Sequence, residues 1–178
     1  RPRARARGGR APPPALPPRL AAPWLADPAA QRVIAALAAG GARALFVGGC
    51  VRDGLIGRPV GDLDLAGDAE PARVIALLDA AGIAHAPTGL AHGTVTALPD
   101  HRPIEITTFR RDEESFGRHA RVAFGAALEE DAARRDFTMN ALYAEADGRV
   151  LDPVGEGLGD LAARRVRFIG DPARRIAE

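Results

Sequence analysis

Residues 46–66 constrain the fold more than any other stretch of the chain. The apolar run 44–47 suits a buried strand, and Gly48 and Gly49 follow it directly. Two glycines let the backbone turn sharply and approach a ligand with no Cβ in the way. A short helix comes next, and the unpaired N–H groups at a helix N-terminus favour anions. We therefore expect this strand, turn and helix to hold phosphates, with Arg52 adding a positive charge.

The second half of the same stretch carries two carboxylates, Asp62 and Asp64, separated by one residue. Side chains alternate along a strand, so both acids should face one pocket while Leu63 and Leu65 face the core. Crowded carboxylates are unfavourable unless a cation neutralises them, and oxygen ligands suit Mg²⁺. In a two-metal site, such acids bridge the ions that assist a phosphoryl displacement. This pattern predicts a magnesium site.

Each half is weak evidence alone, because Gly-Gly is more often a tight turn and Asp-x-Asp is more often a solvated strand end. Together, Gly-Gly-x-Val-Arg-Asp at residues 48–53 and Asp-x-Asp nine residues later resemble the head domain of the DNA polymerase beta superfamily. Within it, the pattern is similar to the class II tRNA nucleotidyltransferase and poly(A) polymerase family. The resemblance implies an α/β (α+β) fold with a mixed, mainly antiparallel sheet and flanking helices. It also implies that Asp53 belongs to the nucleotide-binding set.

A second motif of that family is present almost unchanged at residues 134–141, Arg-Arg-Asp-Phe-Thr-Met-Asn-Ala. The resemblance implies that Arg135 contacts the nucleotide phosphates and that Asp136 and Asn140 lie near the ribose. A plainer alternative is a surface helix whose acids and arginines pair at spacings of three and four. That alternative does not explain Asn140 among helix-forming residues.

Two strands, 93–98 and 103–109, are rich in Val, Ile and Thr and flank a turn. On the second strand Glu105 alternates with isoleucines, so it can supply a third carboxylate to the site, although an exposed strand Glu fits equally well. For His92, a hydrogen-bonded turn residue is favoured over a catalytic base. The polar segment 111–128 corresponds to a flexible loop of the family, and we expect it to be mobile.

Elsewhere the chain predicts ordinary elements. Asp27 caps a helix that begins at Pro28 and ends before Gly40. A second amphipathic helix begins at Pro71, and a hairpin turns at residues 147–148.

Composition divides the chain further. Residues 1–20 are mainly Arg, Pro, Ala and Gly, which predicts disorder. We expect a head domain over 21–165 and the start of a helical neck over 166–178. Residues 170–178 resemble the segment that leads into the family's neck, and the resemblance implies that Glu178 is the first residue of a base-selecting Glu-Asp-x-x-Arg motif whose remainder lies beyond it, so base choice is not assigned. The chain starts with Arg and stops within a helical pattern, which suggests part of a longer protein.

Charge and cysteine usage exclude little. The net charge is +1, and all 24 basic residues are arginines. A single cysteine, Cys50, cannot form an internal disulfide and suits a small packed residue better than a nucleophile. There is no apolar run of the roughly 20 residues that cross a bilayer. We expect a cytoplasmic protein with no membrane association and no evident obligate protein partner.

The resemblance implies a template-independent nucleotidyltransferase that adds CMP and AMP from CTP and ATP to the 3′ end of tRNA, with Mg²⁺ as cofactor and pyrophosphate as product. Alternatives within the family are a poly(A) polymerase or an enzyme that adds only C or only A. An antibiotic-modifying nucleotidyltransferase shares Asp-x-Asp but lacks the Arg135 motif. The alternative from another class is a non-catalytic module that binds RNA or nucleotides, against which the carboxylates argue because they would repel RNA phosphate without a metal.

Overall fold

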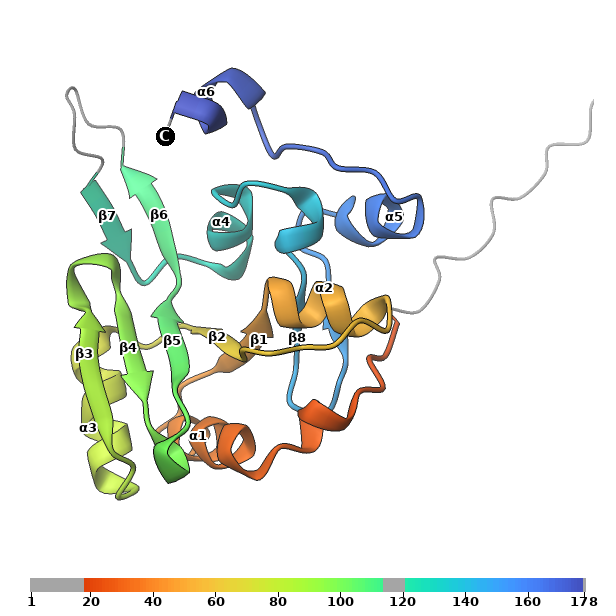
Figure 1. Cartoon of the computed structure of the whole chain (residues 1–178). Coiled ribbons are helices and arrows are strands. Elements are labelled where there is room, and N and C mark those ends of the chain that lie inside the picture. Colours follow the sequence, from red (N-terminus) through yellow and green to blue (C-terminus); the bar gives the residue numbers. More distant parts are fainter. Residues whose placement is uncertain (1–17, 114–120, 178) are drawn as a thin grey trace, which may run out of the picture.

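The computed structural model describes residues 18–113 and 121–177 (Figure 1). These residues form a seven-stranded sheet in the order β3-β4-β5-β2-β1-β8-β9 and a separate two-stranded sheet, β6-β7. The strands are β1 Ala44–Val47, β2 Asp64–Gly67, β3 His85–Gly89, β4 Thr94–Ala97, β5 Ile104–Thr108, β6 Arg110–Glu113, β7 Arg121–Phe124, β8 Tyr143–Ala144 and β9 Val150–Leu151. The α-helices are α1 Pro28–Ala39, α2 Gly49–Leu55, α3 Pro71–Ala80, α4 Leu128–Ala133, α5 Gly157–Ala162 and α6 Pro172–Ala177. Short 3-10 turns are η1 Pro23–Ala26, η2 Leu90–His92, η3 Pro99–His101 and η4 Thr138–Asn140.

The large sheet is mixed and mainly antiparallel. Strands β2 and β5 run parallel, with Asp64 opposite Glu105 and Leu65 opposite Ile106. All other neighbouring strands of this sheet pair antiparallel. A parallel pair needs a crossover, and α3, β3 and β4 supply it. The expected sheet is thus confirmed.

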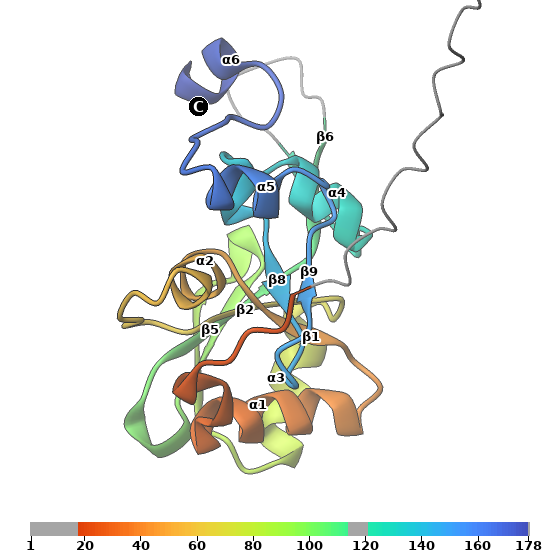
Figure 2. The ribbon, with the colours of Figure 1, turned by 90° about the vertical axis from the view of Figure 1, so that its right-hand side faces the viewer.

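Both faces of the sheet are covered, so β1 is buried throughout. Phe46 packs on one side with α1 and α3, whereas Leu45 and Val47 pack on the other side in the cluster around Tyr143. Figure 2 shows α1 and α3 below the sheet and α4 and α5 above it. The sheet therefore separates a deep apolar core from the side on which polar residues gather.

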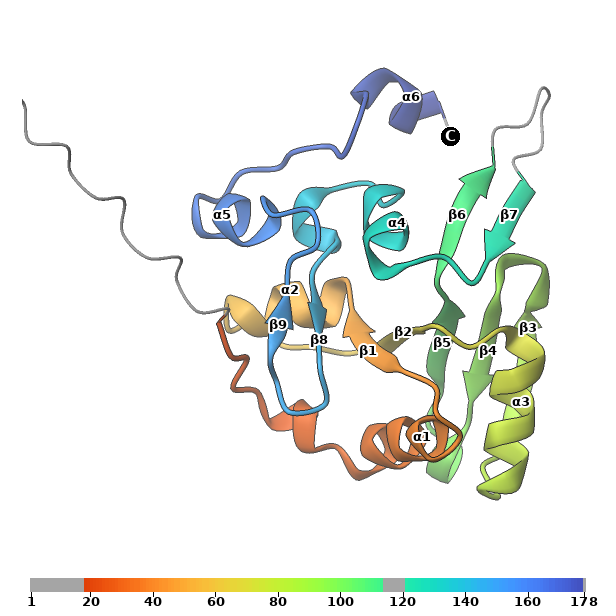
Figure 3. The ribbon, with the colours of Figure 1, turned by 180° about the vertical axis from the view of Figure 1, so that it is seen from behind.

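Local sequence signals explain the two longest helices. The Asp27 carboxylate accepts hydrogen bonds from the N–H groups of Ala29 and Ala30 at 3.0 and 3.1 Å, which caps α1 as predicted. Val33 and Leu37 of α1 are buried, as are three apolar residues of α3, because each helix carries one apolar stripe. The two helices lie side by side on one face (Figure 3).

One predicted segment differs in part from the structure. The ends of the segment expected to be mobile form β6 and β7, held by backbone pairing from Arg110 opposite Phe124 onward, although that segment lacks an apolar pattern; residues 114–120 lie outside the described residues. Helix α4 ends at Ala133, which argues against the plainer alternative of a surface helix that runs through the whole arginine motif.

The expected leader also has a different end. Residues 1–17 lie outside the described residues. Leu20, however, is only 5% exposed, and its N–H donates to the carbonyl of Gly148 at 2.7 Å. This leucine is therefore part of the folded domain. In the described part of the chain, every helix is too short or too polar to cross a membrane.

The segment that precedes α6 is held against residues 136–138 by backbone contacts. Phe137 and Phe168 form an isolated antiparallel bridge, with ring centroids 4.6 Å apart. On either side of it, Thr138 N–H donates to Arg167 and Ile169 N–H donates to Asp136. The predicted division between head and neck at residue 166 remains a prediction.

Candidate active site

The glycine turn forms the floor of a polar pocket. Gly48 has φ +72°, a conformation that residues with a Cβ rarely adopt, and its N–H donates to the carbonyl of Leu142 at 3.1 Å. This turn joins β1 to α2, as the sequence predicted. A Cβ on Gly48 would lie 3.8 Å from the carbonyl oxygen of Asn140, so the glycine turn packs close to the 138–140 turn.

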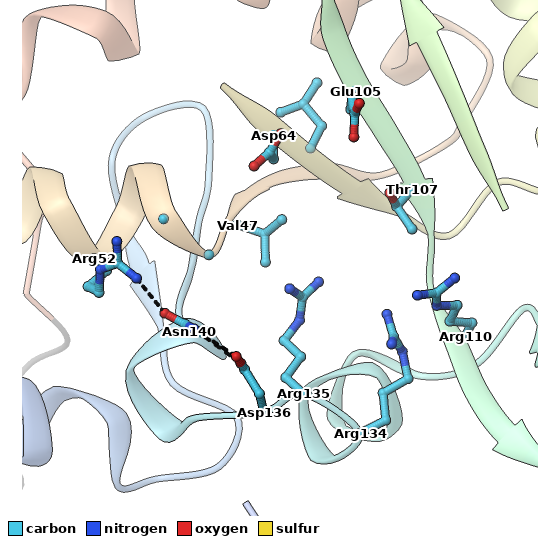
Figure 4. Close-up of a pocket in the computed structure, with 13 residues that line it drawn as sticks. Val47, Arg52, Asp64, Glu105, Thr107, Arg110, Arg134, Arg135, Asp136 and Asn140 are labelled. Carbon is cyan, nitrogen blue, oxygen red and sulfur yellow. Dashed lines mark hydrogen bonds between the residues drawn. The ribbon is translucent and has the colours of Figure 1, made fainter. Parts of the chain in front are cut away.

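The pocket has a volume of about 330 Å³ and is polar on most sides. Its lining comes from β1, α2, β2, β5, β6 and the segment after α4, and consists of Val47, Gly48, Gly49, Arg52, Asp64, Leu65, Glu105, Thr107, Arg110, Arg134, Arg135, Asp136 and Asn140. Figure 4 shows the carboxylates of Asp64 and Glu105 on one side and the guanidinium groups of Arg134 and Arg135 on the other.

The acidic side depends on the parallel pairing of β2 and β5. Asp64 and Glu105 are register partners, so their side chains leave the sheet on the same face. Burial raises the pKa of Asp64, and the nearby charges of Glu105 and Asp62 raise it further, against a smaller lowering by Arg135. The negative charge of Asp64 is therefore disfavoured here, and a bound cation would stabilise it.

Asp62 occupies a different position from the one the strand pattern predicted. It lies before β2, is exposed, and is not among the pocket-lining residues. The alternation nevertheless holds, because Leu63 and Leu65 are both buried. Among the described residues, no three acidic, His or Cys side chains come close enough together to form a preassembled metal site. The structure therefore pairs two carboxylates, with Asp62 nearby.

The basic side is built around a buried carboxylate, Asp131. Arg135 donates to it through Nε at 3.3 Å and Nη2 at 3.0 Å, and Arg134 donates through Nε at 3.1 Å. The Arg135 guanidinium also lies over the ring of Tyr143, 5.2 Å from its centroid. Burial disfavours the charge of Arg135, but Tyr143 and Asp131 outweigh that effect and raise its pKa.

A second polar chain links α2 to the 138–140 turn. Arg52 Nη1 donates to Asn140 Oδ1 at 2.8 Å, and Asn140 Nδ2 donates to the Asp136 carboxylate at 3.1 and 3.2 Å. These contacts are drawn in Figure 4. Arg52 also forms two 2.9 Å hydrogen bonds to Asp53, which does not line the pocket. The structure thus brings Arg52, Asp136 and Asn140 together at the pocket. Asp53 contacts Arg52 from outside the pocket lining.

Two further sequence predictions concern residues beside the pocket. Cys50 is buried, and its Sγ donates to the carbonyl of Val47 at 3.3 Å. Burial raises the pKa of this thiol, as expected for a packed residue. His92 is exposed and lies outside the pocket lining.

Besides the apolar Val47 and Leu65, three polar pocket residues were not singled out as site residues from the sequence, namely Thr107, Arg110 and Arg134. Thr107 lies two residues after Glu105 on β5, so the strand alternation that selected Glu105 could have selected it. Arg134 belongs to a pair of adjacent arginines, and the motif alone favoured its neighbour Arg135.

Comparison with known proteins decides what this pocket belongs to. Residues 44–167 match the family model of the Poly A polymerase head domain. The chain belongs to the poly(A) polymerase head domain family. The resemblance inferred from the glycine turn and the arginine motif is confirmed.

Curated relatives of this head domain include two Bacillus proteins described as CCA-adding enzymes. The one from Bacillus cytotoxicus is 44% identical over 151 residues, covering 84% of this chain and 37% of the relative. The one from Bacillus pumilus is 44% identical over 140 residues, covering 78% of this chain and 34% of the relative. The chain thus spans little more than a third of the length of these relatives.

Solved structures agree on the fold of the head domain. A Bacillus stearothermophilus CCA-adding enzyme in complex with CTP superimposes with a TM-score of 0.73 at 38% identity, over 84% of this chain and 35% of that one. A tRNA nucleotidyltransferase complexed with a primer tRNA and an incoming ATP analogue gives 0.61 at 30% identity, over 78% and 39%. The predicted fold class is confirmed.

Proposed function

We propose that this chain is the catalytic head of an RNA nucleotidyltransferase that adds CMP and AMP, from CTP and ATP, to the 3′ end of tRNA. The observation that carries the proposal is the arrangement of the pocket, in which the Asp64–Glu105 pair faces Arg134 and Arg135. The acids suit a divalent cation, and the arginines suit phosphate. Relatives described as CCA-adding enzymes support tRNA as the acceptor.

The donor set fits a hard divalent cation. Asp64 and Glu105 offer carboxylate oxygens from adjacent strands, and the charge of Asp62 is close enough to raise the pKa of Asp64. We therefore assign these three acids to the cation and propose Mg²⁺ as the ion. Bound there, the cation supplies Lewis acidity that favours the ionised 3′-hydroxyl and stabilises the leaving pyrophosphate.

The other residues bind and orient the nucleotide. Arg135 and Arg134 hold the phosphates, and the backbone at Gly48 and Gly49 lets the triphosphate approach closely. Asn140 is fixed between Arg52 and Asp136, so its position is set before a ribose arrives. Electrostatic preorganisation of this kind avoids reorientation when charge develops on the phosphates. Binding of RNA to such a surface is expected to weaken as salt concentration rises.

A chimera tests the activity directly. The matching head of a Bacillus CCA-adding enzyme is replaced by this chain and incubated with tRNA that lacks its terminal CCA and with each labelled triphosphate separately. Incorporation at the 3′ end of the tRNA supports a catalytic head. The order of C and A in the product is expected to follow the Bacillus part of the chimera, which carries the base-selecting motif. The Asp64→Asn chimera is the control for background. No incorporation by a folded chimera would contradict a catalytic head.

A further inference from the structure

Asp131 is a fully buried carboxylate next to the pocket, and it is not one of the residues that line it. Its exposure is 0%, and it lies in α4, which ends at Ala133; Arg134 and Arg135 follow it at spacings of three and four residues, just after the helix ends. Their hydrogen bonds to Asp131 show that both side chains turn back toward it. Oδ2 also accepts a hydrogen bond from the Tyr143 hydroxyl at 2.7 Å, and Oδ1 accepts one from the backbone N–H of Arg110 at 3.3 Å.

Asp131 holds both arginines through Nε and leaves Nη1 of each without a hydrogen bond to it. Asp131 engages Nε of Arg134 on one oxygen, and Nε and Nη2 of Arg135 on the other. The outer ends of both guanidinium groups therefore reach the pocket, as Figure 4 shows. Nη1 of Arg135 lies 3.9 Å from the point where a Cβ on Gly48 would stand. One carboxylate thus sets the separation of two cations that point the same way.

The positive charge of the two arginines exceeds the negative charge of Asp131. Two guanidinium groups share one carboxylate, so their combined charge toward the pocket stays positive although their side chains are only 15% and 18% exposed. Neighbouring phosphates of a nucleotide tail present negative oxygens in series, which suits two fixed guanidinium donors better than one. Without Asp131, like-charged arginines would repel each other and lose their common anchor.

We infer that Asp131 is a positioning residue that spaces Arg134 and Arg135 so that they bind successive phosphates of the triphosphate, which makes the site count phosphates. This inference rests on the proposed function, because it assigns a triphosphate to the pocket. It predicts that affinity rises from nucleoside monophosphate to diphosphate to triphosphate. Loss of Asp131 should reduce this rise, whereas it should leave the contacts with the base and the sugar unchanged.

The test measures dissociation constants of AMP, ADP and ATP with this chain by isothermal titration calorimetry, in the presence of magnesium. For Asp131→Asn, the preference for ATP over AMP should fall by about tenfold or more, equivalent to losing one charge-assisted hydrogen bond. AMP affinity itself should change much less. Thermal melts confirm that the variant is folded at the titration temperature.

Asp160→Asn is the matched control, because Asp160 is also a buried carboxylate held by a hydroxyl and an arginine. It is 3% exposed, accepts from Thr138 Oγ1 at 2.8 Å and pairs with Arg167 Nε at 3.0 Å, but it does not line the pocket. This variant should lose stability and keep the wild-type preference for ATP. An equal loss of preference in both variants would mean that general loosening is responsible, and would overturn the inference.

Tyr143→Phe replaces Asp131→Asn if the latter does not fold, since it removes only the hydroxyl that joins Asp131 to Arg135. A smaller loss in the same direction supports the inference, and an unchanged ratio contradicts it. Failure of the proposed function looks different: the wild-type chain itself would then show no preference for ATP over AMP. A wild-type preference that Asp131→Asn retains in full overturns the positioning role alone.

Discussion

Asp64 on β2 and Glu105 on β5 are register partners in the parallel strand pair of the large sheet. They come from segments that lie 41 residues apart in the sequence, and the crossover through α3 brings them onto one face. Because burial and two neighbouring carboxylates raise the pKa of Asp64, the pair is unfavourable until a cation neutralises it. This relationship leads to the first prediction.

Asp64→Asn in the chimera should reduce nucleotide transfer by more than about a hundredfold, because it removes a ligand of the assisting cation. Stability should stay the same or rise slightly, since the substitution relieves repulsion with Glu105. Asp62→Asn should also reduce nucleotide transfer. Transfer rates and thermal melts give both readouts, with Asp68→Asn, at an exposed position outside the pocket, as the control. Near-normal transfer by Asp64→Asn would exclude the proposed metal ligand.

Arg135→Ala should raise the Michaelis constants of CTP and ATP by the same factor, because Arg135 is assigned to the phosphates that both share. It should also lower stability by about 3–5 kcal/mol, since Asp131 would lose a buried partner. Initial rates are therefore measured well below the melting temperature. A selective effect on one nucleotide would show that Arg135 contacts the base or depends on it.

Binding of the four triphosphates to this chain should show little base preference. The assigned pocket residues address cation, phosphate and ribose, which ATP, CTP, GTP and UTP have in common. Titration of each magnesium triphosphate under one set of conditions measures this directly. A clear preference for CTP or ATP would mean that residues of this chain already select the base.

The acid stability of the chain should depend on Asp131. Burial raises its pKa, but Arg135, the Tyr143 hydroxyl and Arg134 outweigh burial and bring the pKa below its ordinary value of 3.8. Since the folded state then binds the proton less tightly than the unfolded state, ionised Asp131 stabilises the fold above pH 3.8, and this stability is lost as the pH falls through the lower folded-state pKa.

Urea unfolding of the wild type and of Asp131→Asn at several pH values checks this sign. The difference in unfolding free energy should be constant near neutral pH and shrink as the pH falls below 3.8. A difference that persists undiminished down to the lowest pH at which both proteins fold would show that the charge of Asp131 contributes nothing to stability.

Leu20→Ala should destabilise the fold by about 2–4 kcal/mol, because Leu20 is buried and lies close to Gly54, although the composition around it predicted disorder. Arg19→Ala is the control: its side chain is 64% exposed and pairs with Asp147 on the surface, where solvent screens the interaction, so its loss should change stability little. Denaturant midpoints compare the two, and equal midpoints would place residue 20 outside the core.

The local sequence pattern was sufficient to predict those elements whose conformation depends only on neighbouring residues. The turn at Gly48 follows from what glycine alone permits, the N-cap at Asp27 from a short polar side chain before a proline, and the pocket positions of Arg135 and Asn140 from an ordered motif. Such features are determined within a few residues, so the sequence by itself identified the fold family and most of the residues that line the pocket.

Tertiary structure decided the remainder, because it depends on contacts between distant segments. Pairing of β2 with β5 brought Glu105 opposite Asp64, whereas the start of β2 at Asp64 left Asp62 outside the pocket lining. Asp131 reads as one of three consecutive acids in the sequence, and only packing against Tyr143 on β8 buries it and makes it the anchor of two arginines. Burial changes what a carboxylate does, and burial is a property of the whole fold.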